Sequence, residues 1–406
     1  MTRAVMLAGL RKRLFDLALA ARIAVAAVVR FGLAGAFRQL RAYLRDNRNV
    51  VAGAADRYVR RGRDTYAASA LPPLASRAFL DYLVEEVATF NGRRLSPMVM
   101  ALVSVSSRCP YRCRHCYAAD QLRAEEAVPL DRIVAAVADV GRLGLPNVFL
   151  TGGEPMMRRD DLPAILAPAR DAGVASWLVS TGFGMDRDAL GALLPFGLAG
   201  VVISLDSRDP ERTNAAKGHP EAFARATAAI RAASDIGLLV SVDCVAGPEV
   251  VDPAEYRSFL RFLASLGVHF VNFLPLQRTG GVLRHGVPAI GTDGFRRLEA
   301  LMDASNRGRA NRDLPIAYSP MVFEHTRGCV AGQQFVYVDP LGDVRPCPFL
   351  PEPAGNVRDV PLREIVERVR GGGERAGCYT AYEGLPAVTR LEGKPKAAAG
   401  APEEGT

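Results

Sequence analysis

The sequence predicts an α/β fold whose main part is a parallel (β/α)6-type partial barrel. From about residue 99 to residue 275, short apolar segments alternate with helical patterns, which is typical of strand–helix units around a parallel sheet. Polar and glycine-rich motifs directly follow several of the apolar segments. Because parallel α/β barrels bind ligands at the carboxyl ends of their strands, these motifs predict one shared site at one end of the barrel.

Composition divides the 406 residues into four regions. Residues 1–98 form a basic helical N-terminal extension, residues 99–315 the barrel with a connector, and residues 316–383 a small cysteine-bearing module. Residues 384–406 are rich in Lys, Pro, Ala, Gly and Glu. We expect this tail to be disordered, because it offers little apolar surface to bury.

The strands and helices of the barrel can be placed along the chain. We expect strands over 99–106, 147–151, 175–180, 199–205, 238–246 and 268–275. We expect helices over 129–143, 161–172, 186–194, 221–236 and 253–266, and a further helix over 292–306 in the connector. Parallel crossovers are nearly always right-handed, so this order predicts strands that follow one another around the sheet.

The net charge of +8 is concentrated at the N-terminus. Residues 1–48 contain ten basic and two acidic side chains, so the rest of the chain is formally neutral. The basic balance therefore gives no support for nucleic-acid binding by the barrel. Seven cysteines at uneven spacings in a chain of this length argue against a secreted disulfide scaffold.

Residues 1–48 are rich in Ala, Leu, Val and Arg, which predicts a helix interrupted near Gly32 and Gly35. No uncharged apolar run reaches the length of a membrane span, because Arg22 and Arg30 interrupt the best one. The segment is either a basic amphipathic helix on an anionic membrane surface or a helix packed on the barrel with a solvated basic face. Helical patterns continue through residue 98, and we expect no strand hairpins there.

Cys109, Cys113 and Cys116 form a C-x3-C-x2-C array directly after the first expected strand. Three thiolates on one short loop can reach one metal centre. Structural zinc takes four protein ligands, and no fourth Cys or His follows at zinc-finger spacing. A four-iron cluster fits better, because three thiolates leave one iron free for a small molecule. A zinc knuckle and reactive thiols are the alternatives.

Further motifs follow the later strands. Thr151-Gly152-Gly153-Glu154-Pro155 follows the second strand; its glycines allow close approach of a ligand, and the carboxylate can accept from an ammonium group. Polar side chains also end the third and fourth strands; at the fourth strand, ordinary capping is the alternative role. Arg278 follows the sixth strand, where it could pair with a carboxylate. Cys244, alone in an apolar strand, and the scattered histidines have structural roles by default.

The cysteine array and the Gly-Gly-Glu-Pro stretch, in this order, resemble the radical S-adenosylmethionine (radical SAM) superfamily. His115 occupies the position that is aromatic in that family's signature. The resemblance implies a [4Fe-4S] cluster on the three cysteines and SAM bound to its free iron, with reductive cleavage of SAM to a 5′-deoxyadenosyl radical. It further implies that the cofactor lies against His115, Gly152, Gly153, Glu154, Ser180, Ser204, Asp206 and Arg278.

The C-terminal module carries the remaining three cysteines. Cys329 and Cys347 stand at the two ends of an expected β-hairpin, and Cys378 follows later. This pattern resembles the SPASM/twitch extension of radical SAM enzymes in its shortened form. It implies that Cys329, Cys347 and Cys378 hold one auxiliary [4Fe-4S] cluster. A zinc site or three reduced thiols are the alternatives.

The resemblance implies a radical SAM enzyme that abstracts a hydrogen atom and takes its electron from flavodoxin or ferredoxin. The basic extension favours a membrane-associated or lipid-like substrate, with a peptide or a tetrapyrrole as alternatives. We expect a cytoplasmic protein, peripheral on the inner face of the membrane through residues 1–48. A non-catalytic iron–sulfur electron carrier and a zinc-stabilised scaffold are the rival functions.

Overall fold

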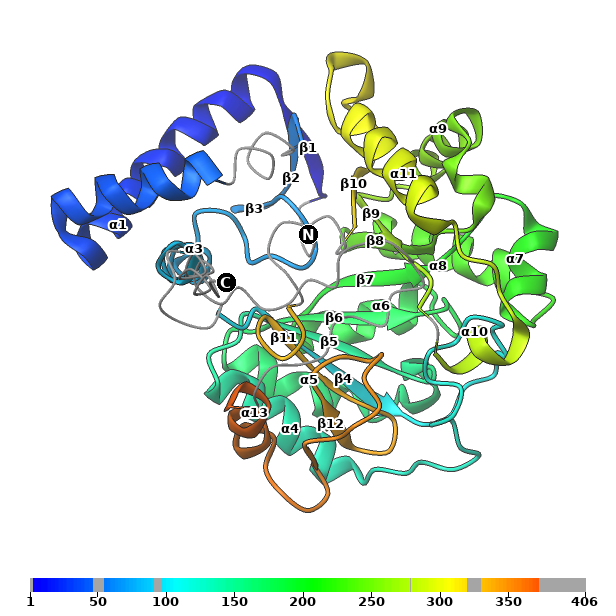
Figure 1. The fold of residues 1–406 in the computed structure, drawn as a ribbon. Helices are drawn as coiled ribbons and strands as arrows, with labels where there is room; N and C mark the ends of the chain where they lie inside the picture. Colours follow the sequence, from blue (N-terminus) through cyan, green and yellow to red (C-terminus); the bar gives the residue numbers. More distant parts are fainter. Residues whose placement is uncertain (1–2, 47–54, 91–96, 278, 320–329, 372–406) are drawn as a thin grey trace, which may run out of the picture.

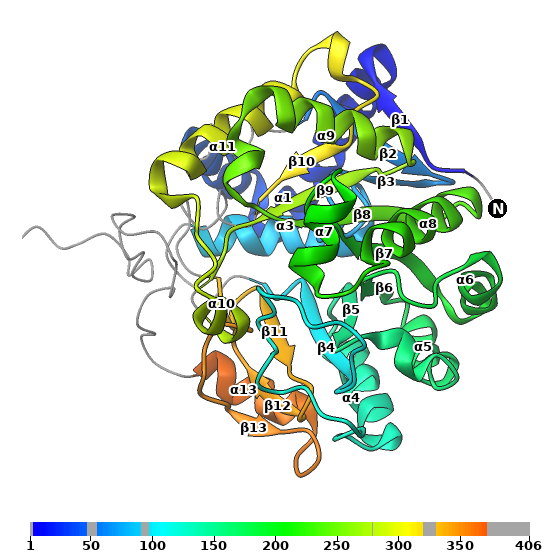
Figure 2. The same cartoon turned by 90° about the vertical axis from the view of Figure 1, so that its right-hand side faces the viewer.

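The computed structural model describes residues 3–46, 55–90, 97–277, 279–319 and 330–371. A ten-stranded sheet forms its centre, in the order β10-β9-β8-β7-β6-β5-β4-β11-β12-β13 (Figures 1 and 2). The two ends of this order do not pair among the described strands, so the barrel is open, as predicted.

The barrel strands run parallel and follow one another along the chain. They are β4 (Met100–Ser106), β5 (Asn147–Gly152), β6 (Ala175–Ser180), β7 (Leu198–Ser204), β8 (Leu239–Val245), β9 (Phe270–Leu274) and β10 (Ile316–Tyr318). The first six match the expected strands within two residues at each end. The seventh strand, β10, lies where the sequence predicts the start of a separate module, so the barrel sheet continues past that boundary.

Helices cover the outer face of the sheet (Figure 2). They are α4 (Leu130–Arg142), α5 (Leu162–Asp171), α6 (Arg187–Leu193), α7 (Pro210–Lys217), α8 (Ala222–Asp235), α9 (Pro253–Ser265) and α11 (Gly291–Asn306), with the short turns η1 (Pro155–Arg158), η2 (Leu194–Phe196), η3 (Pro248–Val251) and η4 (Arg309–Asn311). Every second strand residue, such as Val103, Leu150 and Val201, packs against them in the main core. The short helix α7 was not predicted, because its sequence is polar and shows no apolar period.

The prediction that residues 1–98 lack paired strands is wrong. β1 (Val5–Ala8), β2 (Arg57–Arg61) and β3 (Asp64–Tyr66) form an antiparallel sheet. The pattern is hidden because Arg57, which is buried, stands where an apolar residue would reveal the strand. Its guanidinium donates to the carbonyl oxygens of Ser305, Asn306, Leu314 and Pro315, at 2.7 to 3.2 Å.

This small sheet closes the amino-terminal end of the barrel. Ala4, Val59 and Tyr66 join a second core with the inward residues of the strands, including Phe149, Trp177, Leu239, Phe270 and Ile316. The ring of Phe149 stacks on Trp177 with centroids 5.8 Å apart. The cysteine loop follows the carboxyl end of β4, so the extension and the loop lie at opposite ends of the barrel.

The helices α1 (Gly9–Asp46) and α3 (Arg77–Phe90) lie outside the small sheet (Figure 1). Gly32 has φ 70° and ψ 170°, so α1 is interrupted there as predicted, whereas Gly35 stays helical. Leu19 of α1 packs with Tyr58 and Phe79 in a third core. By length and composition, α1 is the one helix of the described residues that could cross a membrane, despite Arg22 and Arg30.

The C-terminal module is built onto the barrel edge. β11 (Phe335–Val338) pairs parallel with β4 and forms the predicted hairpin with β12 (Asp343–Arg345), which pairs with β13 (Gly355–Asn356). Helix α13 (Leu362–Gly371) packs on α4, where Arg363 donates to the buried carboxylate of Asp139 at 3.1 Å. The tail 384–406 lies outside the described residues.

Candidate active site

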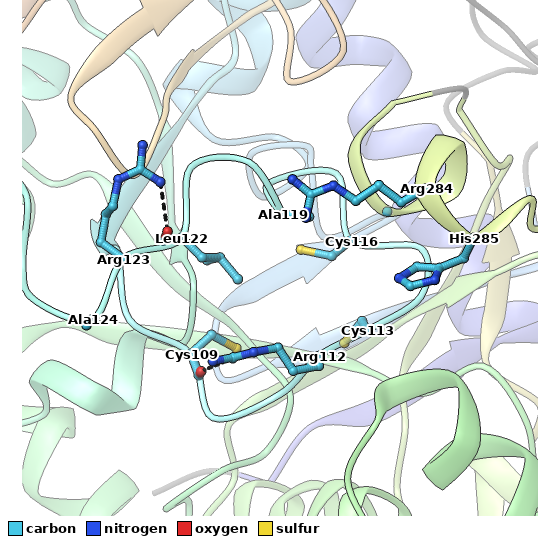
Figure 3. Close-up of a pocket in the computed structure, with 11 residues that line it drawn as sticks. Cys109, Arg112, Cys113, Cys116, Ala119, Leu122, Arg123, Ala124, Arg284 and His285 are labelled. Atoms are coloured by element: carbon cyan, nitrogen blue, oxygen red, sulfur yellow. Dashed lines mark hydrogen bonds between the residues drawn. The ribbon is translucent and has the colours of Figure 1, made fainter.

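Three cysteines of the loop after β4 line one cavity. Cys109, Cys113 and Cys116 border a cavity of about 340 Å³, together with Arg284 and His285 of α10 (Gly280–His285). Figure 3 shows the three thiols at separate corners of the loop, facing a common space. The predicted array therefore forms one site, at the predicted end of the barrel.

Distant segments hold this loop in place. Glu126 accepts from the hydroxyl of Ser106 at 2.8 Å and from the amide of Ser107 at 3.0 Å, where the loop leaves the strand. The amide of Arg112 donates to the carbonyl of Lys217 at 3.1 Å, and the amide of Gly281 donates to that of Cys116 at 2.8 Å. The positions of the cysteines are therefore set by β4, α7 and α10 together.

The arrangement of the thiols fits a cluster better than a single ion. Among the residues that the structure describes, no three Cys, His, Asp or Glu side chains converge on a point that could hold one metal ion. A zinc ion requires its ligands to meet at one point, whereas a four-iron cluster takes thiolates at separate corners. A cavity bordered by three separated thiols provides that arrangement.

The thiols need a cation to become thiolates. Burial raises the pKa of Cys109 to about 12 and that of Cys116 to about 11. Burial also raises the pKa of Cys113. Without a bound cation these groups are protonated at neutral pH, and the charge of bound iron is what favours the thiolate form.

Gly152 and Gly153 lie directly against the cysteine loop. The amide of Gly153 donates to the carbonyl of Ser106 at 2.7 Å, and that of Glu154 donates to Arg108 at 2.8 Å. A Cβ atom on Gly153 would lie 2.2 Å from the carbonyl oxygen of Arg108, and Gly152 has φ 139°. Both positions therefore require glycine, and the two motifs form one structural unit.

Glu154 is fully buried, and its carboxylate is saturated with donors. One oxygen accepts from Ser180 Oγ at 2.7 Å and from the Met156 amide at 3.1 Å. The other accepts from the Thr181 amide at 2.9 Å and from Thr181 Oγ1 at 2.7 Å. Burial raises the pKa of Glu154 despite these bonds. The contacts fill the four acceptor positions of a carboxylate, so in this geometry Glu154 and Ser180 join the second and third strands.

Ser204 and Asp206 contact a cation that sequence reasoning missed. Lys217 Nζ lies 2.5 Å from Ser204 Oγ and 3.0 Å from Asp206 Oδ2, and His115 Nε2 lies 3.6 Å from the same carboxylate oxygen. Burial acts to lower the pKa of Lys217, but the charge of Asp206, the hydrogen bond to it and the other neighbouring groups together outweigh burial, so the pKa is raised. Burial lowers the pKa of His115 to about 4, so this ring is neutral.

A row of polar side chains crosses the inner face of the barrel. Ser204, Asp243, Asn272 and Tyr318 are register neighbours on β7 to β10. Asn272 donates to Asp243 Oδ1 at 3.2 Å, and burial raises the pKa of Asp243 to about 6. Within the described part of the chain, the buried Asn272 Oδ1 has no hydrogen-bond partner. This polar row lies between the apolar core beneath it and the cysteine loop above.

The other predicted site residues are only partly placed. Cys347 is buried just after β12. Cys329, Cys378 and Arg278 lie outside the described residues. Cys244 is buried in β8, as predicted. Lys217 and His285 were missed because neither belongs to a motif; only the fold brings α7 and α10 to the cysteine loop.

Comparison with known protein families identifies the class. Residues 103–263 match the family described as the radical SAM superfamily, and residues 329–370 match the SPASM iron–sulfur cluster-binding domain. The chain belongs to the radical SAM superfamily. It is an enzyme that uses a [4Fe-4S] cluster and SAM, and its SPASM domain carries an auxiliary cluster.

Individual relatives share most of this architecture. The chain is 30% identical over 283 residues to the PqqA peptide cyclase of Gluconobacter oxydans, covering 66% of this chain and 76% of that protein. It is 24% identical to the AdoMet-dependent heme synthase of Nitratidesulfovibrio vulgaris, covering 64% and 76%. The structure of Streptococcus suis SuiB bound to its precursor peptide SuiA superposes with a TM-score of 0.57 at 16% identity, covering 72% and 70%, which shows a shared fold.

Proposed function

We propose that this enzyme binds its catalytic cluster and SAM at the cavity lined by Cys109, Cys113 and Cys116, and abstracts a hydrogen atom from a substrate held in the barrel. The observation that carries the proposal is the contact between the two motifs, in which Gly153 bonds to the loop that holds three cavity-lining thiols. When bound, the cluster supplies one electron, which splits SAM to a 5′-deoxyadenosyl radical.

The protein's own part is to position the cluster and SAM and to exclude water from them. The three thiols would hold the cluster, and Gly152 and Gly153 keep the second motif packed against the cysteine loop, where SAM would bind. Glu154 fixes Thr181, and the buried pair of Lys217 and Asp206 holds the far side of the loop, next to a neutral His115. Ser180 supports this arrangement through its hydrogen bond to Glu154, and Ser204 supports it through its contact with Lys217.

We propose that Cys347, with Cys329 and Cys378, holds the auxiliary cluster. Burial of Cys347 after a strand that joins the barrel sheet supports a site coupled to the barrel. Such a cluster could accept an electron from the substrate radical or bind the substrate. A flavodoxin or ferredoxin in the cytoplasm is the proposed reductant.

The substrate class is proposed from the polar row. Asp243 and Asn272 offer oxygens to a group that carries N–H donors, which favours a peptide. The two peptide-related proteins in the comparisons also favour this class. A membrane-associated or lipid-like substrate is the second candidate, favoured by the exposed extension, although α1 lies at the barrel end opposite the cysteine loop.

Reductive cleavage of SAM tests the proposed site. The purified enzyme, reconstituted with iron and sulfide under anaerobic conditions and reduced with dithionite, should form 5′-deoxyadenosine from SAM. Cys113→Ala should abolish this product, while Cys244→Ala, which alters a cysteine outside the cavity, should retain it. Equal product from wild type and Cys113→Ala would overturn the proposed site.

A further inference from the structure

Helix α1 exposes large apolar side chains to solvent on both sides of its kink at Gly32. Ten large hydrophobic side chains of the described residues are exposed, and eight belong to α1. Because α1 is kinked at Gly32, these side chains form one face on each of its two parts, where most recur at intervals of three or four residues. We call them together the apolar face of α1: Leu10, Leu14, Leu17, Val25 and Val29 before the kink, and Leu33, Phe37 and Leu44 after it. Val29 is 83% exposed and Leu33 is 80% exposed. Soluble monomers rarely expose a contiguous apolar patch of this kind without a partner.

The other side of α1 is fixed to the protein. Leu19, Ala27, Ala36 and Tyr43 are buried along its length, and Leu19 packs with Tyr58 of β2 and Phe79 of α3. Crossing a bilayer would strip these contacts from the helix. The helix is therefore built to lie flat on an adjoining surface; its part before the kink, residues 9–31, is about 35 Å long.

The charge of α1 indicates which kind of surface its apolar face contacts. Arg11, Arg13, Arg38 and Arg41 are exposed on α1. The acidic Asp16 already accepts from Lys12 at 2.7 Å. A second copy of the chain would bring the same arginines against these, whereas anionic lipid headgroups complement them.

A cavity supports this choice of partner. It has a volume of about 520 Å³ and lies beside the first turns of α1; basic side chains, Arg13, Arg309 and Arg312 among them, outnumber the two carboxylates of Asp16 and Asp56 in its lining. Arg309 and Arg312 come from the turn η4 and the residue after it, so a second element adds positive charge at the same place. An anionic headgroup at the bilayer surface could contact both elements.

We propose that α1 docks the enzyme on an anionic lipid bilayer, with the apolar face of α1 inserted at the headgroup boundary and the arginines among the phosphates. The extension closes the amino-terminal end of the barrel, so the cysteine loop then faces water. The membrane holds the enzyme in place, and the substrate enters from the aqueous side. This docking does not depend on the proposed radical chemistry.

Flotation with lipid vesicles tests the proposal on the full chain. Wild type should float with vesicles of phosphatidylcholine and phosphatidylglycerol, and should float less with phosphatidylcholine alone and at high salt. The variant Val29→Glu/Leu33→Glu should lose roughly tenfold or more of this binding, because the exposed apolar side chains drive insertion. Leu283→Glu is the matched control, since it alters an exposed leucine outside α1, and it should bind like wild type.

Three results would overturn the docking proposal. Wild type could stay with the aqueous phase for both vesicle types, or the Val29→Glu/Leu33→Glu variant could bind as wild type does. A lipid-free dimer that the same double substitution converts to a monomer would assign the apolar face to a second copy instead. Circular dichroism of both variants establishes that they are folded, since both positions are exposed.

Discussion

Gly153 makes the two motifs of the active site one unit, and this gives a prediction at the scale of a single residue. In Gly153→Ala, the new Cβ would lie 2.2 Å from the Arg108 carbonyl oxygen, so the cysteine loop must move. We expect most of the cluster on this loop to be lost, measured as iron and sulfide per chain. Gly191→Ala, where no atom beyond the chain neighbours and the helix's own backbone lies within 4 Å of the new Cβ, should keep the wild-type content.

His269 gives a second residue-scale prediction, on pH. It is buried and accepts from the Val240 amide at 3.0 Å, and burial lowers its pKa to about 4. As the pH falls below about 6.5, this histidine is protonated in the unfolded state but stays neutral in the folded state. The free energy of unfolding therefore falls until about pH 4, where the folded state also binds the proton. The shift corresponds to roughly 3 kcal/mol of unfolding free energy.

The variant His269→Asn checks this account. Asparagine keeps an acceptor for the Val240 amide but does not titrate. Denaturant unfolding at pH 7 and pH 4.5 should show that wild type loses more stability than the variant. An identical loss in both proteins would contradict the role of His269.

At the scale of elements, the packing of α13 on α4 depends on Asp139. This buried carboxylate accepts from Arg142 at 2.8 Å and from the side chain of Arg363 at 3.1 Å. Asp139→Ala should destabilise this contact by about 2 kcal/mol, because it removes hydrogen bonds to a charged acceptor. Hydrogen exchange of 362–371 should then speed up. Asp160→Ala, at a carboxylate that is 95% exposed, should change stability by about 0–1 kcal/mol.

The elements also show what a sequence can predict. The six strands β4 to β9 were predicted because their apolar runs are largely buried and separated by clear helical patterns. The small sheet β1-β2-β3 was not predicted, since its buried Arg57 is balanced by carbonyl groups from residues 305–315. Such compensation comes from tertiary contacts and leaves no periodic signal in the sequence.

At the scale of the whole molecule, the chemistry is concentrated at one end of the barrel and the extension at the other. The motifs that touch the cluster could be predicted because their spacing is local. Lys217, His285 and the polar row could not be, because residues far apart in the chain meet only in the folded barrel. The apolar face of α1 likewise could not be assigned from the sequence, because only the structure shows which residues of this helix are buried against the protein.

The central claim is that Cys109, Cys113 and Cys116 hold one cluster and that the C-terminal cysteines hold a second. Metal and sulfide content after anaerobic purification tests it most directly, in the wild type and in the Cys109/Cys113/Cys116→Ala variant. We expect about eight iron per chain in the wild type and about four in the variant. Zinc without iron or sulfide, with failure of anaerobic reconstitution, would contradict the account.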